Sequence, residues 1–330
     1  MTIARRDLLG IGAAVALSMT AASCRAVDGA VGRVPEPDPG PHGADGFLPE
    51  QLPDGLMFYG ASVPWHRPVR PWEQSLGRPL STHRSYFTPG AEEVQHLLDQ
   101  CRDDALHRRL PHVSLKAPGR WRDVAAGRND DWLRSILVPL GRTGHPALFT
   151  LHHEPENDAS PDGRTPADFV AMQHHVIRLA DELAPRVTVV PVLQHWTFDP
   201  LRDDIDPSVW VVPRARVLGL DLYNPWSEDN GKEWRTFSGK LDEVIGWFGD
   251  RPLVIGEYGC RADPENPGRA AQWFHDAADH ARTRGVISMS YFNSSINAED
   301  GTWELSGETE EAFSELLAAD WVARPPAVRA

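Results

Sequence analysis

The sequence predicts one (β/α)8 barrel, preceded by an export signal and a linker. Eight short β-rich runs alternate with amphipathic helical segments between residues 56 and 291. The run starts are spaced by about 33 residues, which is enough for a strand, a helix and two loops. The stretch 51–322 is also close to the roughly 250 residues that are typical of such a barrel.

The expected strands are short runs rich in β-branched and aliphatic residues. They cover residues 56–61, 83–87, 112–116, 147–151, 187–193, 217–222, 253–255 and 286–291. The segment 62–82, between the first two strands, has little helical pattern. We therefore expect the first helix to be short or replaced by a loop.

The clearest helix begins after Thr165, which is followed by Pro166 and then by Asp168. A cap residue, a proline at the first helical position and an acid three residues after the cap are typical of a helix start. Apolar residues then recur at intervals of three and four up to Leu183, which predicts one buried face. Similar patterns predict helices within residues 94–105, 241–248, 271–278 and 309–319.

The N-terminus is typical of a bacterial export signal. Residues 1–24 contain Arg5 and Arg6, followed by an apolar run that stops near Ala22. The arginine pair before this run resembles a twin-arginine signal. The run is too short to favour a membrane-spanning helix. We therefore expect the protein to be extracellular or attached to the cell surface.

The end of this signal resembles a lipoprotein box, in which Cys24 would become the acylated first residue. Ordinary cleavage nearby, with release of a free product, is the alternative. Residues 25–50 are rich in Pro and Gly and predict an extended linker. The predicted domain order is then this linker, the barrel over 51–322, and a tail over 323–330.

Composition limits the class of partner. The formal net charge of −14 disfavours nucleic acid and anionic lipid, whereas a neutral polymer would not be repelled. With only three cysteines, no disulfide framework organises the fold. If Cys24 is acylated, Cys101 and Cys260 remain, either as a pair or as two buried thiols. We expect a monomer.

Two motifs place a glutamate just after or at the end of an expected strand. Leu-His-His-Glu-Pro-Glu-Asn begins at Leu151 and puts Glu154 after the fourth strand, and Val-Ile-Gly-Glu-Tyr-Gly puts Glu257 at the end of the seventh. Catalytic residues lie at the carboxyl ends of barrel strands. Hydrolysis of a glycosidic bond needs two carboxyl groups, one to protonate the leaving oxygen and one to attack or stabilise the sugar cation.

Zinc chemistry fits the first motif poorly. A zincin requires His-Glu-x-x-His, but Asn157 stands where the second histidine should be. The later Pro-Cys-x-x-Cys of the zinc deaminases is absent from the sequence. Strand alternation makes Glu154 and Glu156 point the same way, so the spacing leaves open which of them is the acid.

On these residues the chain resembles glycoside hydrolase family 26 and, more broadly, clan A of the glycoside hydrolases. The matching islands are His153-Glu154 after strand four and Glu257-Tyr258-Gly259 at strand seven. The resemblance implies that Glu154 is the acid/base and Glu257 the nucleophile. It further implies retention of anomeric configuration and no metal or organic cofactor.

The resemblance also implies supporting residues. Tyr223 would donate a hydrogen bond to the nucleophile, Arg84 would pair with its carboxylate, and His153 would orient the site. Three tryptophans that follow strands three, five and six are candidate sugar platforms, because indole faces stack on sugar rings. They are Trp121, Trp196 and Trp226.

The chain departs from the family pattern at two places. Pro155 to Asp158 replace the Met-Asn-Gly that follows the acid in many family mannanases. Tyr291 stands in the strand that usually carries a Trp floor, where it is a candidate substrate contact. These departures leave open which glycan the protein would cleave.

The sequence thus predicts a retaining, endo-acting hydrolase of a mannan-like or other β-linked polysaccharide. The alternative is a cell-surface barrel that binds glycan without turning it over.

Overall fold

Nine parallel strands form the sheet of the computed structural model, which describes residues 48–63, 68–296 and 301–327. The strands are β1 Phe58–Ser62, β2 Thr82–Phe87, β3 Leu110–Leu115, β4 Ala147–Leu151, β5 Val187–Val189, β6 Val192–Gln194, β7 Leu218–Asn224, β8 Leu253–Cys260 and β9 Val286–Phe292. Their order in the sheet is β5-β4-β3-β2-β1-β9-β8-β7-β6. All described residues belong to one compact unit, 36–330.

The two edge strands are two halves of one barrel strand. β5 pairs with β4 and β6 pairs with β7, and only Val190 and Pro191 separate them along the chain. Val190 donates its N–H to the Phe149 carbonyl on β4, and the Pro191 carbonyl accepts from Gly219 on β7. Pro191 has no N–H to give to a ladder, which explains the break. With β5 and β6 counted as one strand, eight strands therefore form a (β/α)8 barrel, as predicted.

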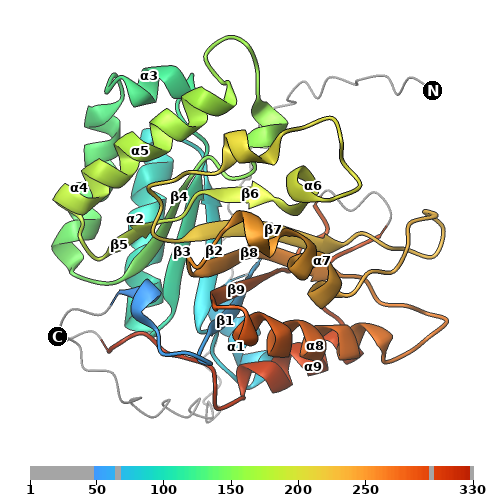
Figure 1. The fold of residues 1–330 in the computed structure, drawn as a ribbon. Helices are drawn as coiled ribbons and strands as arrows, with labels where there is room; N and C mark the ends of the chain where they lie inside the picture. The colour runs from blue at the N-terminus through green and yellow to red at the C-terminus, as the bar shows by residue number, and fades with distance from the viewer. Residues whose placement is uncertain (1–47, 64–67, 297–300, 328–330) are drawn as a thin grey trace, which may run out of the picture. The chain divides into compact units, whose positions relative to one another are not determined.

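Helices pack outside these strands (Figure 1), with α3, α4 and α5 on one side of the view and α7, α8 and α9 on the other. Their bounds are α1 Val69–Leu76, α2 Ala91–Leu106, α3 Trp121–Ala125, α4 Asp130–Thr143, α5 Pro166–Leu183, α6 His195–Phe198, α7 Phe237–Val244, α8 Arg269–Thr283 and α9 Glu308–Leu317. The 3-10 turns are η1 Pro49–Gln51, η2 Pro155–Asp158, η3 Pro207–Trp210 and η4 Ile245–Trp247. None of the helices in the described part of the chain has the length and hydrophobicity to span a membrane.

The predicted helices all form. Thr165 caps α5 through a reciprocal capping box with Asp168, and α1 is short, as its weak pattern indicated. Helix α4 was not anticipated as an element of its own. The predicted export signal, Cys24 and most of the linker lie outside the described residues. Beyond residue 322, buried Ala323 donates its N–H to the Met57 carbonyl.

Apolar side chains form two separate clusters. The larger cluster lies between the strands and the helices, and the smaller one draws residues from six strands and adjoining segments. The smaller cluster contains Leu52, Phe58, Leu110, Leu148, Val190, Val192, Val217, Val254, Ile287 and Ala323. Because strand side chains alternate between the two faces, this smaller cluster is the apolar filling of the barrel.

Polar side chains further along the strands continue the filling of the barrel. Arg84, His112 and Thr150 are all buried, and Arg84 Nη1 lies 2.7 Å from His112 Nε2. Burial and the Arg84 charge hold the pKa of His112 well below its usual value, so its ring is neutral. This polar layer carries the candidate site.

A bulge in β8 sets the direction of Glu257. The pairing of β7 with β8 steps from Leu220↔Ile255 to Asp221↔Glu257, so Gly256 is an extra residue on β8. A bulge of this kind reverses the alternation of side chains that follow it. Without it, the alternation that places Val254 inside the barrel would turn Glu257 outward.

Candidate active site

Glu154 and Glu257 meet at the carboxyl ends of the strands. Glu154 follows β4 and Glu257 lies in β8, and one carboxylate oxygen from each lies within 4.8 Å of the other. One oxygen of Asp221, on β7, lies within the same distance of both. The barrel therefore brings together the two glutamates that the sequence singles out, and adds a third carboxyl group.

The segment before Glu154 has an unusual backbone. His152 and Glu154 have φ angles of 64° and 47°, in the left-handed region that non-glycine residues rarely adopt. The Glu154 N–H donates to the Val192 carbonyl on β6 over 3.0 Å, which fixes the turn. Such strained residues concentrate at functional sites. Pro155 then starts η2, and this turn ends the strand-like alternation.

His152 holds this turn in place. Its Nδ1 accepts from the Ala117 N–H over 3.1 Å and from Trp121 Nε1 over 3.0 Å. Its Nε2 donates to Asp158 over 2.9 Å. No local sequence pattern separates this structural histidine from His153, which only the family resemblance singled out.

Glu257 is buried and has three partners. The hydroxyl of Tyr86 donates to Oε1 over 2.7 Å, and the hydroxyl of Tyr223 donates to Oε2 over 2.7 Å. Arg84 Nε lies 3.7 Å from Oε1 and also donates to the Tyr86 hydroxyl over 3.0 Å. Burial and the Glu257 charge raise the pKa of both tyrosines well above their usual value, so both remain proton donors.

Tyr223 and Arg84 thus contact the carboxylate that the resemblance indicated. Tyr86 was not among the expected site residues, although it lies two positions after Arg84 on β2. Period-two alternation from Arg84 places Tyr86 on the same face, so this signal was available in the sequence.

Glu154 has a different environment. Burial, and then the nearby Glu257 carboxylate, raises the pKa of Glu154 to about 7. Its Oε2 accepts from the Asn157 side-chain amide over 3.0 Å. A carboxyl group with this pKa carries its proton at slightly acid pH and loses it slightly above neutrality, as a group that must act as acid and then as base requires.

Asp221 lies close to both glutamates. It is buried, and neither carboxylate oxygen has a hydrogen-bond partner among the described residues. Burial, and then the Glu257 charge, raises the pKa of Asp221 well above its usual value, so it is a neutral acid. Asp221 was not among the expected site residues.

Glu156 occupies a different place from Glu154. Its Oε1 accepts from the Gln194 N–H over 3.1 Å, and its Oε2 is buried without a partner among the described residues. It is not part of the carboxylate trio. Burial raises its pKa to about 7 as well, so the two glutamates differ in position and not in pKa.

His153 contacts the site through Tyr86. Its ring lies edge-on to the Tyr86 ring, with centroids 5.5 Å apart, and its Nδ1 lies 2.8 Å from Ser114 Oγ. Its carbonyl accepts from Lys116 Nζ over 2.8 Å. Burial, and then the charge of Lys116, lowers the pKa of His153 well below its usual value. The neutral ring therefore supports a tyrosine that holds Glu257.

One cavity adjoins Glu154, and another adjoins the residues that contact Glu257. The larger, of about 670 Å³, is lined by Glu154, Asp221 and Tyr223 together with residues that follow β6 and β7. The smaller, of about 330 Å³, is lined by Arg84 and Tyr86 together with residues near the ends of β1, β2 and β9.

The three tryptophans that were expected to stack on sugar rings differ in their exposure. Trp196 is 49% exposed and lines the larger cavity. Trp226 is half-buried and packs edge-on against Trp234. Trp121 is fully buried, so the expectation that it presents a face to sugar is wrong. It fails because α3 turns the indole into the core, where it donates to His152.

Tyr291 is also misplaced as a substrate contact. It is 1% exposed, and its hydroxyl donates to the Cys260 carbonyl over 3.3 Å. Its ring packs between Tyr258 and Phe274, so it belongs to the core. The next residue, Phe292, is the one whose ring reaches Tyr86 and Tyr223.

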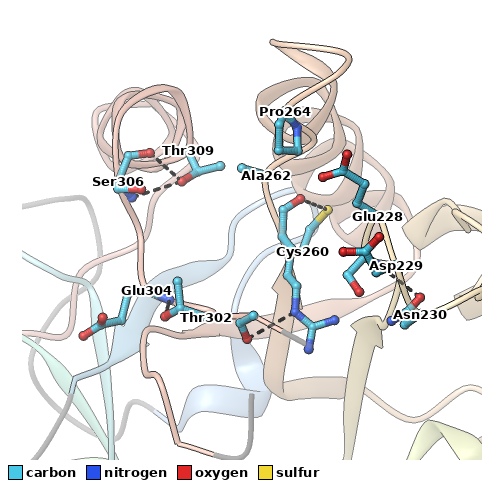
Figure 2. Close-up of a pocket in the computed structure, with 13 residues that line it drawn as sticks. Glu228, Asp229, Asn230, Cys260, Ala262, Pro264, Thr302, Glu304, Ser306 and Thr309 are labelled. Carbon is cyan, nitrogen blue, oxygen red and sulfur yellow. Dashed lines mark hydrogen bonds between the residues drawn. The ribbon is translucent and has the colours of Figure 1, made fainter. Parts of the chain in front are cut away.

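A third cavity, of about 520 Å³, lies over the ends of β7 and β8. Figure 2 shows Glu228 and Asp229 on one side of it and Glu304 on the other. Cys260 also lines it, and its thiol contacts the Arg261 carbonyl. Both Cys260 and Cys101 are free and buried, which settles the open question of their pairing.

Among the described residues, two groups of side chains are close enough to share a metal ion. One is the trio of Glu154, Asp221 and Glu257, and the other is His195, Asp199 and Glu243. In the second group, Asp199 already accepts from Arg235 over 2.6 Å. A metal ion there would meet a positive charge at close range, which disfavours it.

Comparisons with known proteins agree with this geometry at the level of fold. No family model matches the sequence, and no curated protein matches it significantly. Among solved structures, a modular endo-β-1,4-mannanase of family 26 from Cellulomonas fimi has a TM-score of 0.56 and 13% identity, over 81% of this chain and 72% of that one. A β-glycosidase from Pyrococcus horikoshii has a TM-score of 0.55 and 12% identity, over 82% and 95%.

A ruminal family 26 endo-β-1,4-mannanase gives a TM-score of 0.51 and 12% identity over 81% of this chain. The chain spans 64% of the length of that enzyme. The chain has the fold of these glycosidases. The expected resemblance to family 26 and its clan is therefore confirmed in the fold, while identities this low carry no assignment of residues.

Proposed function

We propose that this chain is a retaining glycoside hydrolase that cleaves a β-linked polysaccharide, with Glu154 as acid/base and Glu257 as nucleophile. The observation that carries the proposal is the separation of their carboxylate oxygens, which lie within 4.8 Å of each other. Retaining enzymes hold their two carboxyl groups about 5 Å apart, whereas inverting enzymes need roughly 6.5–9.5 Å to admit a water molecule.

The environments of the two groups support different roles. Two tyrosine hydroxyls and Arg84 surround Glu257 and favour a fixed carboxylate, which is the form that attacks an anomeric carbon. Glu154, with its pKa raised to about 7 mainly by burial, holds the proton that the departing oxygen needs.

The reaction then has two steps. Glu257 forms a bond to the anomeric carbon as the glycosidic C–O bond breaks, and Glu154 gives its proton to the leaving oxygen. In the second step the Glu154 carboxylate takes a proton from water, whose oxygen displaces Glu257. Both steps invert the anomeric centre, so the product keeps the configuration of the substrate.

A β-glycan cleaved at internal bonds is the substrate class that we propose. Two family 26 structures of the same fold are described as endo-β-1,4-mannanases, and another is described as a β-glycosidase. One cavity next to Glu154, and another next to the residues that contact Glu257, support the binding of more than one sugar unit.

Reducing-sugar release from mannan, xylan, β-glucan and arabinan tests the activity. We expect turnover of at least one polymer, and loss of it in Glu154→Gln and Glu257→Gln with binding retained. Product analysis by NMR should show the original anomer first. An inverted product, or equal residual turnover in both variants, contradicts the proposed roles. Binding without turnover in the native chain would support the glycan-binding alternative.

We also propose that the chain is exported through residues 1–24 and attached to the membrane by acylation of Cys24. The support is the sequence pattern alone. Mass spectrometry of the mature N-terminus from the membrane fraction tests it, with Cys24→Ala as the control variant. A soluble product that begins at another residue would replace the anchor with simple secretion.

A further inference from the structure

The larger cavity adjoins Glu154, the proposed acid. Glu154 lines this cavity and Glu257 does not. In the proposed mechanism the acid protonates the leaving oxygen, so the sugar that departs must lie on the acid's side. The cavity of about 670 Å³ is large enough to hold at least one sugar unit there.

A buried ammonium group with one long ion pair lines the same cavity. Lys240, in α7, is 5% exposed, and its Nζ lies 3.9 Å from Asp199 Oδ2. That distance is too long for a hydrogen bond, and no other side-chain partner for Nζ occurs among residues 48–63, 68–296 and 301–327. The two Asp199 oxygens already accept from the Leu201 N–H over 3.0 Å and from Arg235 over 2.6 Å.

Two carboxylates and one guanidinium group lie near Lys240. Arg235 faces it from the loop before α7, Asp199 from the loop after α6, and Glu243 from α7 itself, where it also pairs with Arg235. His195 donates to the Lys240 carbonyl over 3.0 Å, and burial lowers the pKa of this ring to about 4, so it adds no charge near neutrality. Burial, and then Arg235, lowers the pKa of Lys240 to about 8.

Exposed apolar side chains line the cavity alongside the charged Lys232 and Glu233. Trp196 and Leu201 are 49% and 75% exposed, and both line the cavity together with Pro225. An indole accepts the apolar face of a sugar ring, and a buried ammonium group needs an anionic or strongly polar acceptor.

From these features we infer that the cavity binds a uronic acid unit on the leaving-group side of the bond, with its carboxylate on Lys240 and its ring against Trp196. This inference rests on the proposed function and names its substrate class. The cleaved polymer would then be an acidic or acid-substituted β-glycan. The overall charge of −14 makes a local positive site necessary for such a ligand, since the protein as a whole repels it.

Binding to methyl glycosides tests the inference on the full chain without requiring turnover. The probes are the methyl β-glycosides of glucuronic, mannuronic and galacturonic acid, each compared with its neutral parent by calorimetry. We expect one uronide to bind roughly tenfold to hundredfold more tightly than its parent, as for a hydrogen bond to a charged group. Because the bond needs the ammonium form, this preference should fall as the pH rises through about 8.

Variants identify the residue. Lys240→Met, which keeps the length of the side chain, should abolish the preference, and Lys240→Arg should retain part of it. Arg134→Gln, an exposed residue of α4, removes one positive charge elsewhere and should leave the preference intact. Thermal unfolding shows whether each variant is folded.

The outcomes separate this inference from the proposed function. The inference is overturned if uronides and their neutral parents bind equally, or if the preference for a uronide survives in Lys240→Met. It is also overturned if methyl glycosides that carry sulfate bind more tightly than the uronides. Hydrolysis of neutral polymers in that case leaves the proposed function standing. Uronide binding without hydrolysis of any polymer supports the site and contradicts the enzyme.

Discussion

Asp221 and Glu257 are direct neighbours in the pairing of β7 with β8, and their carboxylate oxygens lie within 4.8 Å of each other. Two ionised carboxylates this close repel each other, so one is expected to keep its proton. The buried Asp221, whose pKa is raised by burial and by Glu257, is that group. Glu257 is then free to act as an anion, which the proposed mechanism requires.

The pH dependence of activity should report Glu154. Because its pKa is raised to about 7, mainly by burial, kcat/KM should fall as the pH rises through about 7, where the acid loses its proton. Glu154→Gln should lower kcat on polysaccharide by roughly 10²–10⁴ and remove this alkaline limb.

Glu156→Gln is the matched control, since Glu156 has a pKa raised to about 7 but lies outside the carboxylate trio. The limb should persist in this variant. If the alkaline limb is lost in Glu156→Gln and kept in Glu154→Gln, the acid is Glu156.

The two tyrosines should contribute to kcat through Glu257. Tyr86→Phe and Tyr223→Phe each remove one hydroxyl that donates to this carboxylate. A hydrogen bond to a charged group is worth about 1.5–3 kcal/mol, so kcat should fall roughly tenfold to hundredfold in steady-state assays. Tyr291→Phe removes a hydroxyl that bonds a backbone carbonyl instead, and should leave kcat within about twofold.

Gly256 should be intolerant of a side chain. A Cβ at this position would lie 2.6 Å from Asp221 Oδ1 and 2.9 Å from Arg84 Nη1, so one of these groups must move. Gly256→Ala should destabilise the fold by about 1–3 kcal/mol in urea unfolding and abolish activity, because both neighbours support Glu257. At Gly246 an added Cβ meets nothing within 4 Å, and Gly246→Ala should keep full activity.

Two tryptophans should give opposite results. Trp121→Ala deletes a fully buried indole and should lower the free energy of unfolding by about 3–5 kcal/mol. Trp196→Ala, at a position 49% exposed in the larger cavity, should change stability by about 0.5 kcal/mol or less.

The same Trp196→Ala change should raise KM roughly threefold to tenfold, as for an aromatic contact of about 0.5–1.5 kcal/mol. An unchanged KM would remove Trp196 from the substrate site. Urea unfolding and steady-state kinetics on the same preparations make the comparison.

The sequence predicted the barrel because its evidence is local and repeated. Strand runs, helical stripes and the Thr165 cap each depend on neighbouring residues, and eight such units admit few arrangements. The sequence also predicted that Glu257 lies at the end of its strand. The direction of the Glu257 side chain could not be predicted, because the bulge at Gly256 depends on how β8 pairs with β7.

The choice between Glu154 and Glu156 shows the same limit. Alternation makes them equivalent, but the left-handed Glu154 and the turn that begins at Pro155 end the alternation between them. The burial of Trp121, the contact of Tyr86 with Glu257 and the separate free thiols were decided in the same way.

The sequence by itself determined the order of strands and helices, the placement of two glutamates at or just after strand ends, and the supply of aromatic side chains. Tertiary structure alone decided which side chains share a space. The physical reason is that closing the barrel brings the carboxyl ends of β2, β4, β7 and β8 together. The ionisable side chains there, Arg84, Glu154, Asp221 and Glu257, lie close enough to interact electrostatically. No spacing along the chain encodes these distances, because they arise from register, bulges and closure together.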